Sequence, residues 1–455
     1  MAFKSVNPAT GKIVATYKET PPAEVGRIIE RCQKAWLDWR RKRFSERAGP
    51  MRAAANILRV KARDYGRLMA QEMGKPISDG IAEAQKCAIG CDYFADNAEH
   101  FLAREIIETD ASKSFVTFQP IGVVLAIMPW NFPFWQVFRF AAPALMAGNA
   151  AILKHASNVS GCALEIEKIF REAGFPEDLF RTLLVPSKRV NAIIEHPLVR
   201  AVTLTGSGPA GRAVAAKAGQ QLKKTVLELG GSDPYLVLED ADVELAAQIS
   251  VKGRLVNAGQ SCIAAKRFIV VEKMRAQFEK LFVERMRAVK VGDPMQESTK
   301  VGPMARRDLR DDLHKQVQKS IKKGARILCG AEMPKGPGAF YPPTVLSDVK
   351  KGMAAYEEEL FGPVAAVIPV KDEAEAIRVA NDSAFGLGGA VFSRDLARAE
   401  RIAAEEIEAG CVFVNEAVKS DPRLPFGGVK ESGYGRELAA YGIREFVNVK
   451  TVFIA

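Results

Sequence analysis

Between residues 150 and 219 the sequence alternates regularly between short apolar runs and amphipathic helical segments. The predicted elements are, in order, a strand at 150–154, a helix at 161–173, a strand at 183–185, a helix at 190–195, a strand at 201–205 and a helix at 211–219. Strands that alternate with helices over short connections form a parallel, doubly wound sheet. We therefore expect an α/β fold.

The rest of the chain extends this pattern. A second α/β region is predicted from 230 to 415, with strands near 235–238, 267–271 and 364–370, and residues 22–108 have helical periodicity. The tail at 446–454 alternates like an edge strand. A chain of 455 residues also exceeds what one hydrophobic core usually supports, so two or three domains are expected.

Charge and cysteine usage favour an ordinary cytoplasmic enzyme. The formal net charge is +11, but Lys and Arg are scattered, and the densest cluster is Arg40–Arg43. Nucleic-acid and membrane surfaces normally concentrate basic residues on one element, so we expect no nucleic acid or membrane partner. Seven cysteines without a disulfide-like pattern suit reduced thiols in a cytosol, and the four histidines show no metal-ligand spacing.

The segment Gly206-Ser207-Gly208-Pro209-Ala210-Gly211 follows a predicted strand and opens a predicted helix. Backbone N–H groups at such a turn can bind a pyrophosphate, although a plain tight turn has the same pattern. If this segment is a dinucleotide-binding fingerprint, Glu228, which lies about 20 residues further on, would bind the ribose of the dinucleotide.

Two residues are candidates for catalysis. Glu228 lies in an apolar stretch that ends in Gly230-Gly231, and burial would raise its carboxyl pKa as a general base near neutrality requires. Its alternative role is a local cap or ion pair. Cys262 lies between a glycine turn and small residues predicted to start a helix, whose dipole would stabilise a thiolate. Its alternative is a packed thiol.

Six motifs together resemble the aldehyde dehydrogenase superfamily over essentially the full length of the chain. They are PWNFP at 129–133, GSGPAG at 206–211, LELGG at 227–231, GQSC at 259–262, ELFGP at 359–363 and PFGG at 425–428. The resemblance implies a Rossmann-like cofactor domain (1–107 and 128–229), a catalytic α/β domain (230–436) and a small β oligomerisation element. That element would combine a hairpin at 108–127 with 437–455, in a homodimer or dimer of dimers.

The resemblance also implies catalytic roles. Cys262 would attack the aldehyde carbon, Asn131 and the Cys262 N–H would hold the oxyanion, and Glu228 would activate the water that hydrolyses the thioester. Glu228 is then a base rather than a ribose ligand. A glutamate there also argues against the acylating, coenzyme-A-dependent relatives, which usually lack it.

Further residues are assigned to the cofactor by the same resemblance. Glu359 would bind the nicotinamide ribose, Phe361 would pack near the nicotinamide, and Ser207 and Trp130 would lie along the pyrophosphate. The full cofactor set is Pro129, Trp130, Lys154, Ser157, Gly206, Ser207, Gly211, Leu229, Glu359 and Phe361.

The cofactor preference depends on Lys154-His155-Ala156-Ser157. NAD-preferring members resemble Lys-Pro-x-Glu here, and this chain has Ser157 in place of that carboxylate. The substitution removes a charge that would repel a 2′-phosphate, and Lys154 adds a positive one. We predict NADP as the cofactor, with NAD as the weaker alternative, and His155 as a packing residue.

Trp135 and Arg139 follow Asn131 by four and eight residues on a predicted helix, so all three share one face. Arg139 would bind a carboxylate at the far end of a short aldehyde, unless it is a structural arginine. With Ser420 in the loop 418–425, the chain is similar to bacterial NADP-dependent succinate-semialdehyde dehydrogenases. Some relatives carry a second substrate arginine where this chain has Val256.

The expected reaction is therefore oxidation of succinic semialdehyde to succinate with NADP. Glutarate semialdehyde or a neutral aldehyde remains the alternative within the same enzyme class. In a different class, the fold would serve as a scaffold that binds nucleic acid or protein, which only the net charge and the Arg40–Arg43 cluster support.

Overall fold

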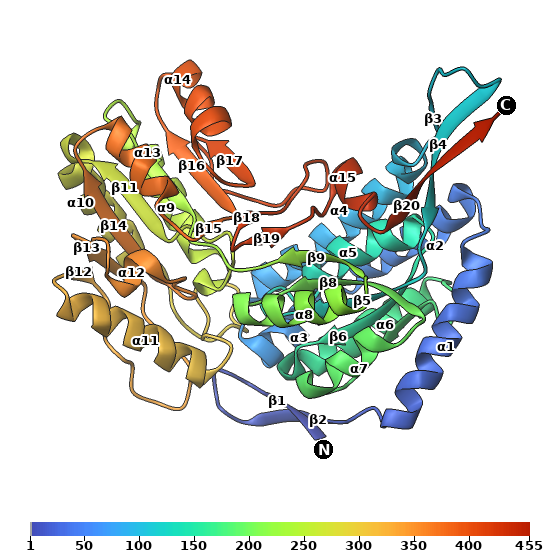
Figure 1. Cartoon of the computed structure of the whole chain (residues 1–455). Coiled ribbons are helices and arrows are strands. Elements are labelled where there is room, and N and C mark those ends of the chain that lie inside the picture. The colour runs from blue at the N-terminus through green and yellow to red at the C-terminus, as the bar shows by residue number, and fades with distance from the viewer. Residues whose placement is uncertain (1) are drawn as a thin grey trace.

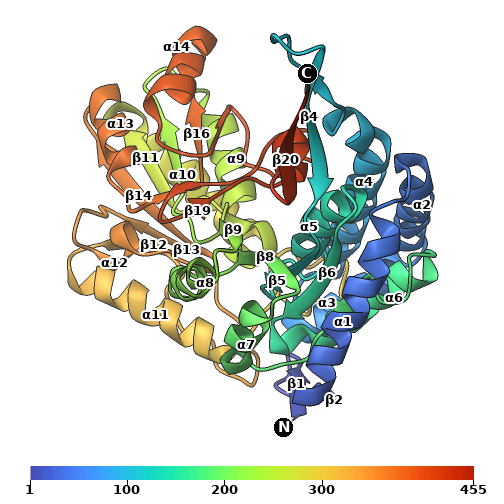
Figure 2. The ribbon, with the colours of Figure 1, turned by 45° about the vertical axis from the view of Figure 1, so that its right-hand side comes forward.

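The structure, a computed structural model, describes residues 2–455. Two large sheets, each with its own helices, form two lobes, and a small sheet projects from the first lobe (Figure 1). The N-terminal hairpin of β1 (Ala2–Val6) and β2 (Ile13–Lys18) lies at the opposite end of the molecule from the C-terminus (Figure 2).

The first sheet is parallel except for one short edge strand. In spatial order its strands are β19 (Gly433–Tyr434), β9 (Lys224–Glu228), β8 (Val199–Thr205), β5 (Val123–Met128), β6 (Ala150–His155) and β7 (Phe180–Thr182). Nearly every side chain of β5 and β6 is buried, as expected for strands that are covered on both faces. The doubly wound prediction is confirmed, although the strand predicted at 183–185 lies at 180–182 instead.

Helices cover this sheet. The crossovers contain α5 (Trp135–Met146), α6 (Ser160–Glu172), α7 (Val190–Glu195) and α8 (Gly208–Gln220), with 3-10 turns η1 (Ser157–Val159) and η2 (Ser187–Arg189). The predicted N-terminal helical region contains α1 (Pro22–Trp39), α2 (Phe44–Val60), α3 (Ala62–Met73) and α4 (Ile77–Phe101). Helix α4 packs on α5, and this contact later forms part of the site.

The second sheet has seven strands. In spatial order they are β12 (Arg326–Cys329), β13 (Thr344–Ser347), β14 (Val364–Val370), β11 (Arg267–Val271), β10 (Pro234–Val237), β16 (Gly388–Phe392) and β17 (Cys411–Val414). All pairs are parallel except β12 with β13. Its helices are α9 (Val243–Leu255), α10 (Glu272–Ala288), α11 (Arg307–Lys322), α12 (Ala354–Glu357), α13 (Glu373–Asn381) and α14 (Leu396–Arg401), followed by the π-turn η4 (Ile402–Glu406).

The small sheet has the order β20 (Val447–Ile454), β4 (Lys113–Pro120) and β3 (Glu105–Ile106). The predicted tail strand is thus confirmed, but the predicted hairpin at 108–127 is wrong. Residues 123–128 pair with β6 and β8 in the first sheet, not with β4. The physical reason is that Val123-Val124-Leu125-Ala126-Ile127-Met128 is apolar on both faces, and only a covered sheet buries both faces.

Several short elements lie outside the three sheets described so far. They are the 3-10 turn η3 (Val256–Gly259), the strand pair β15 (Phe385–Gly386) and β18 (Val429–Lys430), and α15 (Ala439–Ile443). Phe426 and Leu387 from beyond residue 230 pack into the first lobe's core, and Cys262 packs against it. The carboxyl ends of β5, β8 and β9 face this junction, where ligands of open α/β sheets usually bind. No helix within residues 2–455 is both long and apolar enough to cross a membrane.

Candidate active site

A cavity of about 260 Å³ lies at the carboxyl ends of β5, β8 and β9. It brings together Cys262, Asn131 and most of the predicted cofactor residues, which lie on both lobes. Its lining is Pro129, Trp130, Asn131, Thr205, Gly206, Ser207, Leu229, Gly230, Cys262, Leu309, Glu359 and Phe361. Motifs far apart in the sequence therefore share one cavity.

The turn that opens α8 has the geometry of an anion site. Ser207 is the N-cap residue, but its side chain makes no capping hydrogen bond, so its hydroxyl stays free beside the helix N-terminus. At Gly211 a Cβ would lie 2.6 Å from Leu229 Cδ1. Glycine at this position therefore lets the first turn of α8 pack closely on the end of β9.

Two residues from the second lobe close the cavity. Glu359 Oε1 accepts a hydrogen bond from the Gly231 N–H at 3.0 Å and lies 3.5 Å from Lys266 Nζ. The rings of Phe361 and Trp130 meet edge to face, with centroids 5.7 Å apart. These contacts position a carboxylate and an aromatic face next to the Gly206–Ser207 turn.

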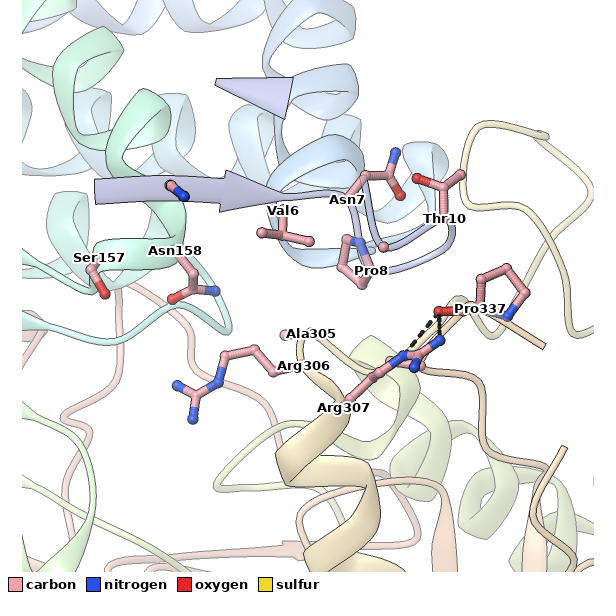
Figure 3. Close-up of a pocket in the computed structure, with 13 residues that line it drawn as sticks. Val6, Asn7, Pro8, Thr10, Ser157, Asn158, Ala305, Arg306, Arg307 and Pro337 are labelled. Carbon is pink, nitrogen blue, oxygen red and sulfur yellow. Dashed lines mark hydrogen bonds between the residues drawn. The ribbon is translucent and has the colours of Figure 1, made fainter. Parts of the chain in front are cut away.

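A second, larger cavity of about 670 Å³ lies between the N-terminal hairpin, the segment after β6 and the start of α11. In Figure 3, Ser157 and Asn158 approach it from the first lobe, and Arg306 reaches toward them from the start of α11. Arg306 is oriented by Asp308, with Nε 3.0 Å from Oδ1. Lys4 of β1 and Arg307 of α11 also line this cavity, and its positive charge suits an anionic group.

Lys154 and His155 end strand β6, just before Ser157. Lys154 is 8% exposed, burial lowers its ammonium pKa, and no carboxylate lies within 4 Å of it in residues 2–455. His155 is buried and bonded to the Pro133 carbonyl at 2.9 Å, and burial lowers its pKa to about 4. His155 is thus neutral at physiological pH and packs in the interior.

The segment around Cys262 differs from the sequence expectation. No helix starts there: α9 ends at Leu255, η3 ends at Gly259, and the next element is β11. Burial raises the pKa of the Cys262 thiol to about 12, although the charges of Arg139 and Lys266 act in the opposite direction. A helix dipole is therefore not what activates this thiol.

A buried cation holds this segment instead. Lys266 Nζ donates to the carbonyls of Ser261 and Cys262 at 2.8 and 2.6 Å. Asn257 and Ala258, with φ of 52° and 56°, adopt the left-handed conformation that non-glycine residues rarely take. Such strain persists only when surrounding contacts fix it, so the loop before Cys262 is rigidly held.

Amide side chains connect Asn131 to the cysteine loop. Asn257 Nδ2 donates to the Asn131 carbonyl at 2.7 Å, and Asn131 Nδ2 donates to the Gln260 carbonyl at 3.1 Å. An amide nitrogen has two N–H groups, so one N–H of Asn131 is still available for a ligand. The contacts fix Asn131 beside the cavity that contains Cys262.

Glu228 is 1% exposed, and neither carboxylate oxygen has a hydrogen-bond partner among residues 2–455. Burial raises its pKa well above the ordinary value, the Arg139 charge lowers it, and the Glu437 charge raises it. At Gly427 a Cβ would lie 2.8 Å from Glu228 Oε1, so the PFGG motif keeps space around this carboxyl. The local cap or ion pair considered above is not formed.

Arg139 lies close to the cysteine cavity, but its charge is paired within the protein. Its side chain is 2% exposed and forms an ion pair with Glu437, and the guanidinium lies 4.7 Å from the Phe426 ring centroid. Nη2 is 3.4 Å from Thr205 Oγ1. Arg139 lines neither the cysteine cavity nor the adjoining cavity described next. The geometry is that of the structural arginine named above as the alternative.

Trp135 and Ser420 do meet. Trp135 Nε1 donates to Ser420 Oγ at 3.0 Å, and Lys86 Nζ donates to the same oxygen at 2.7 Å. Lys86 and Trp135 line a cavity of about 580 Å³, which Asn257, the residue that bonds to the Asn131 carbonyl, lines as well. Phe132 and Val256 line it too.

Sequence reasoning missed four residues of this site: Lys86, Asn257, Lys266 and Glu437. Asn257 and Lys266 lie within five residues of Cys262, so proximity to the motif is a usable signal. Lys86 and Glu437 have no comparable signal, because their partners are distant in sequence.

Two expectations from composition can also be compared with the structure. All seven cysteines are free thiols, and no group of three or more metal-ligating side chains occurs within residues 2–455.

In the basic cluster, Lys42 and Arg43 pair with Glu46, and Arg40 lies 4.5 Å from the Trp36 ring centroid. The cluster is therefore a solvated face with local partners, which weakens the nucleic-acid alternative.

The fold and this site define an aldehyde dehydrogenase. The aldehyde dehydrogenase family model matches residues 1–452, and the chain belongs to that family. It is 50% identical, over the whole of both chains, to a Synechocystis sp. protein named probable succinate-semialdehyde dehydrogenase [NADP(+)]. A Mycobacterium avium protein named succinate-semialdehyde dehydrogenase [NADP(+)] is also 50% identical, and the match covers all of this chain and 97% of that protein.

Solved structures agree with this assignment. The succinic semialdehyde dehydrogenase of Streptococcus pyogenes in complex with NADP⁺ superposes over the full length of both chains, with a TM-score of 0.97 and 37% identity. The structure of Gox0499 superposes equally completely, with a TM-score of 0.98 and 41% identity. The predicted family and fold are confirmed.

Proposed function

We propose that the chain is an NADP-dependent succinate-semialdehyde dehydrogenase, which oxidises succinic semialdehyde to succinate. The observation that carries this proposal is the cavity shared by Cys262, Asn131 and the cofactor motifs, with Glu228 buried behind it. Relatives at 50% identity over the full chain carry that name.

In the first step, the Cys262 sulfur attacks the aldehyde carbon after losing its proton. Burial opposes this ionisation, and the nearby charges of Arg139 and Lys266 favour it. The available N–H of Asn131 stabilises the negative charge that develops on the aldehyde oxygen. Loss of one such donor typically reduces the rate about 10²- to 10³-fold.

The cofactor completes the oxidation. Trp130, Ser207 and Glu359 would hold NADP⁺ in this cavity, and the cofactor would supply a hydride acceptor, so that loss of hydride from the Cys262 hemithioacetal would leave a thioester on Cys262. Glu228 then removes a proton from a water molecule, the oxygen of which attacks the thioester carbon. The carbon–sulfur bond breaks, the acid leaves, and the Cys262 thiol is restored. A carboxyl with a raised pKa is a suitable base for this step near neutral pH.

For the 2′-phosphate of NADP we propose Ser157, Lys154 and, in addition, Arg306. The donor set fits a phosphate: Ser157 and Arg306 line one cavity, and Lys154, three residues before Ser157 in β6, has no carboxylate partner among the described residues. Arginine forms planar, paired hydrogen bonds with phosphate oxygens.

We further propose a homodimer or dimer of dimers that forms through the small sheet. Strand β20 lies at one edge of that sheet and exposes Val449, Phe453 and Ile454. An exposed apolar edge strand is a template for pairing with another chain. The domain division proposed from the sequence would then end the first oligomerisation segment at Pro120, where β4 ends. Seven free cysteines fit a reducing compartment.

The experiment that tests the proposed function compares kcat/KM for succinic semialdehyde and for butanal, each with NADP and with NAD. We expect the acidic aldehyde with NADP to be the best of the four combinations. Equal turnover of butanal would remove the semialdehyde assignment, and equal use of NAD would remove the cofactor assignment.

A further inference from the structure

Helix α5 begins without a cap of its own. Its N-cap residue, Phe134, has no polar side-chain atom, and its first turn, which starts at Trp135, contains no acidic residue. The first N–H groups of a helix need acceptors from outside the helix, and a buried N–H without an acceptor is unfavourable. Phe134 and Trp135 are both buried, so bulk water does not supply these acceptors. The cap therefore has to come from another part of the chain.

Glu83 of α4 supplies this cap. Its Oε1 accepts hydrogen bonds from the N–H groups of Phe134 and Trp135, both at 2.9 Å, and the side chain is buried. A carboxylate at a helix N-terminus also interacts favourably with the helix dipole. Asn131 lies only three residues before Phe134, so the contact fixes the segment that carries the proposed oxyanion donor.

Lys75 completes this contact. It lies between α3 and α4, is 1% exposed and forms an ion pair with the other carboxylate oxygen of Glu83. Its Nζ also lies 3.8 Å from the Phe132 ring centroid, which is a cation–π contact. The Lys75–Glu83 pair thus contacts three of the four residues that directly follow Asn131 in the chain.

The second lobe holds Asn131 from the other side. Asn257 donates to its carbonyl at 2.7 Å, and its own Nδ2 donates to the Gln260 carbonyl at 3.1 Å. A catalytic donor has to be held within about 0.5 Å of its working position, and a displacement of about 1 Å can reduce the rate 10²-fold. Contacts from both lobes therefore determine where the free N–H of Asn131 points.

We propose that Glu83, held by Lys75, is a positioning residue for the oxyanion donor Asn131. This inference rests on the proposed function, in which Asn131 stabilises the developing negative charge, and deepens it by naming the residues that hold that donor in place. Glu83 acts through the backbone of residues 132–135. Its loss should therefore slow the chemical step for acidic and neutral aldehydes alike.

The test compares two variants that both remove the buried charges, Lys75→Met/Glu83→Gln and Lys75→Met/Glu83→Leu. Glutamine keeps an oxygen that can accept both N–H groups, and leucine, which has a similar size, has no acceptor. With NADP saturating, we expect kcat of the leucine variant to be about 10- to 100-fold below that of the glutamine variant, with KM for both aldehydes within about twofold. Fluorescence titration with NADP verifies that both variants are folded. Equal kcat values would overturn the proposal.

A double-mutant cycle with Asn131→Ala separates positioning from general destabilisation. If Glu83 acts through Asn131, the difference in kcat between the leucine and glutamine variants should shrink to less than about threefold in the Asn131→Ala background. A difference of the original size in that background would overturn the proposal, because the loss would then be independent of the donor.

If the leucine variant does not fold, Glu83→Asp decides. It keeps the charge but withdraws the carboxylate by one methylene, so kcat should fall about tenfold with KM unchanged. An unchanged kcat would contradict the proposal. The matched control is Glu72→Asp, since Glu72 is a buried glutamate that accepts from the Gly161 and Cys162 N–H groups at the start of α6, both at 2.9 Å. Its kcat should stay within about threefold of the wild type, and a loss as large as that of Glu83→Asp would also contradict the proposal.

Failure of the proposed function is detected separately. An unaltered kcat of Asn131→Ala alone would remove the oxyanion role itself. A large loss in Asn131→Ala, combined with an undiminished effect of Glu83, would remove only the positioning role. If the wild-type enzyme prefers butanal, the semialdehyde assignment is lost, and the same cycle measured with butanal still tests Glu83.

Discussion

The two sides of Cys262 are built in different ways. On the cofactor side, residues come from turns directly after parallel strands, such as Ser207 after β8 and Leu229 after β9. On the substrate side, they come from helices α4 and α5 and from the loop around Ser420. The first arrangement is fixed by local backbone geometry, and the second by side-chain partners that are distant in sequence.

This difference explains which sequence predictions can be made. The Gly206–Gly211 motif predicts its own turn, helix and place in the sheet. Arg139, by contrast, lies on the predicted helix, but the fate of its charge depends on Glu437, almost 300 residues later in the chain. The same charge on Lys86 has no such partner. One sequence cannot show which of two buried cations is neutralised.

The largest effect is expected for Cys262→Ala, because both sides of the comparison meet at this thiol. Aldehyde oxidation should fall by at least about 10³-fold, since the covalent step is lost. Binding of NADP, measured by fluorescence titration, should be retained. A matched control is Cys329→Ala, a buried cysteine of the second lobe that should keep its activity. Full activity of Cys262→Ala would contradict the covalent mechanism.

Arg139→Met tests whether this arginine is structural. Removal of one partner from a buried ion pair typically costs about 3–5 kcal/mol, because the other charge is left uncompensated. We expect a marked loss of stability in denaturant unfolding and similar losses on acidic and neutral aldehydes. The double variant Arg139→Met/Glu437→Leu should recover much of the stability. A stable Arg139→Met enzyme with a defect confined to the acidic aldehyde would show that Arg139 binds the substrate carboxylate.

Ser157→Glu changes only the cofactor side. A carboxylate beside the proposed 2′-phosphate site should repel that phosphate and raise KM for NADP roughly tenfold, with KM for NAD unchanged or lower. Arg306→Ala should give a smaller rise, about threefold, because Arg306 is more exposed. Steady-state kinetics measures KM for NADP and KM for NAD in each variant. A parallel change for NAD would argue against selective phosphate binding.

The fold, and the cavity that the motif residues share, could be predicted well because their signals are local. Alternating strands and helices gave the first sheet, and the apolar strand at 123–128 was misplaced only because a pairing partner had to be chosen without tertiary information. The expected helix at Cys262 was wrong, because a loop held by Lys266 and two left-handed residues replaces it. Small residues after a cysteine do not by themselves distinguish the start of a helix from such a loop.

The most direct test of the central claim traps the covalent intermediate. In Glu228→Gln the thioester should form on Cys262 but hydrolyse slowly, because the base is absent. Intact-mass spectrometry after mixing with succinic semialdehyde and NADP should show one succinyl group per chain, and peptide mapping should place it on Cys262. No adduct, or an adduct on another cysteine, would contradict the mechanism proposed for this site.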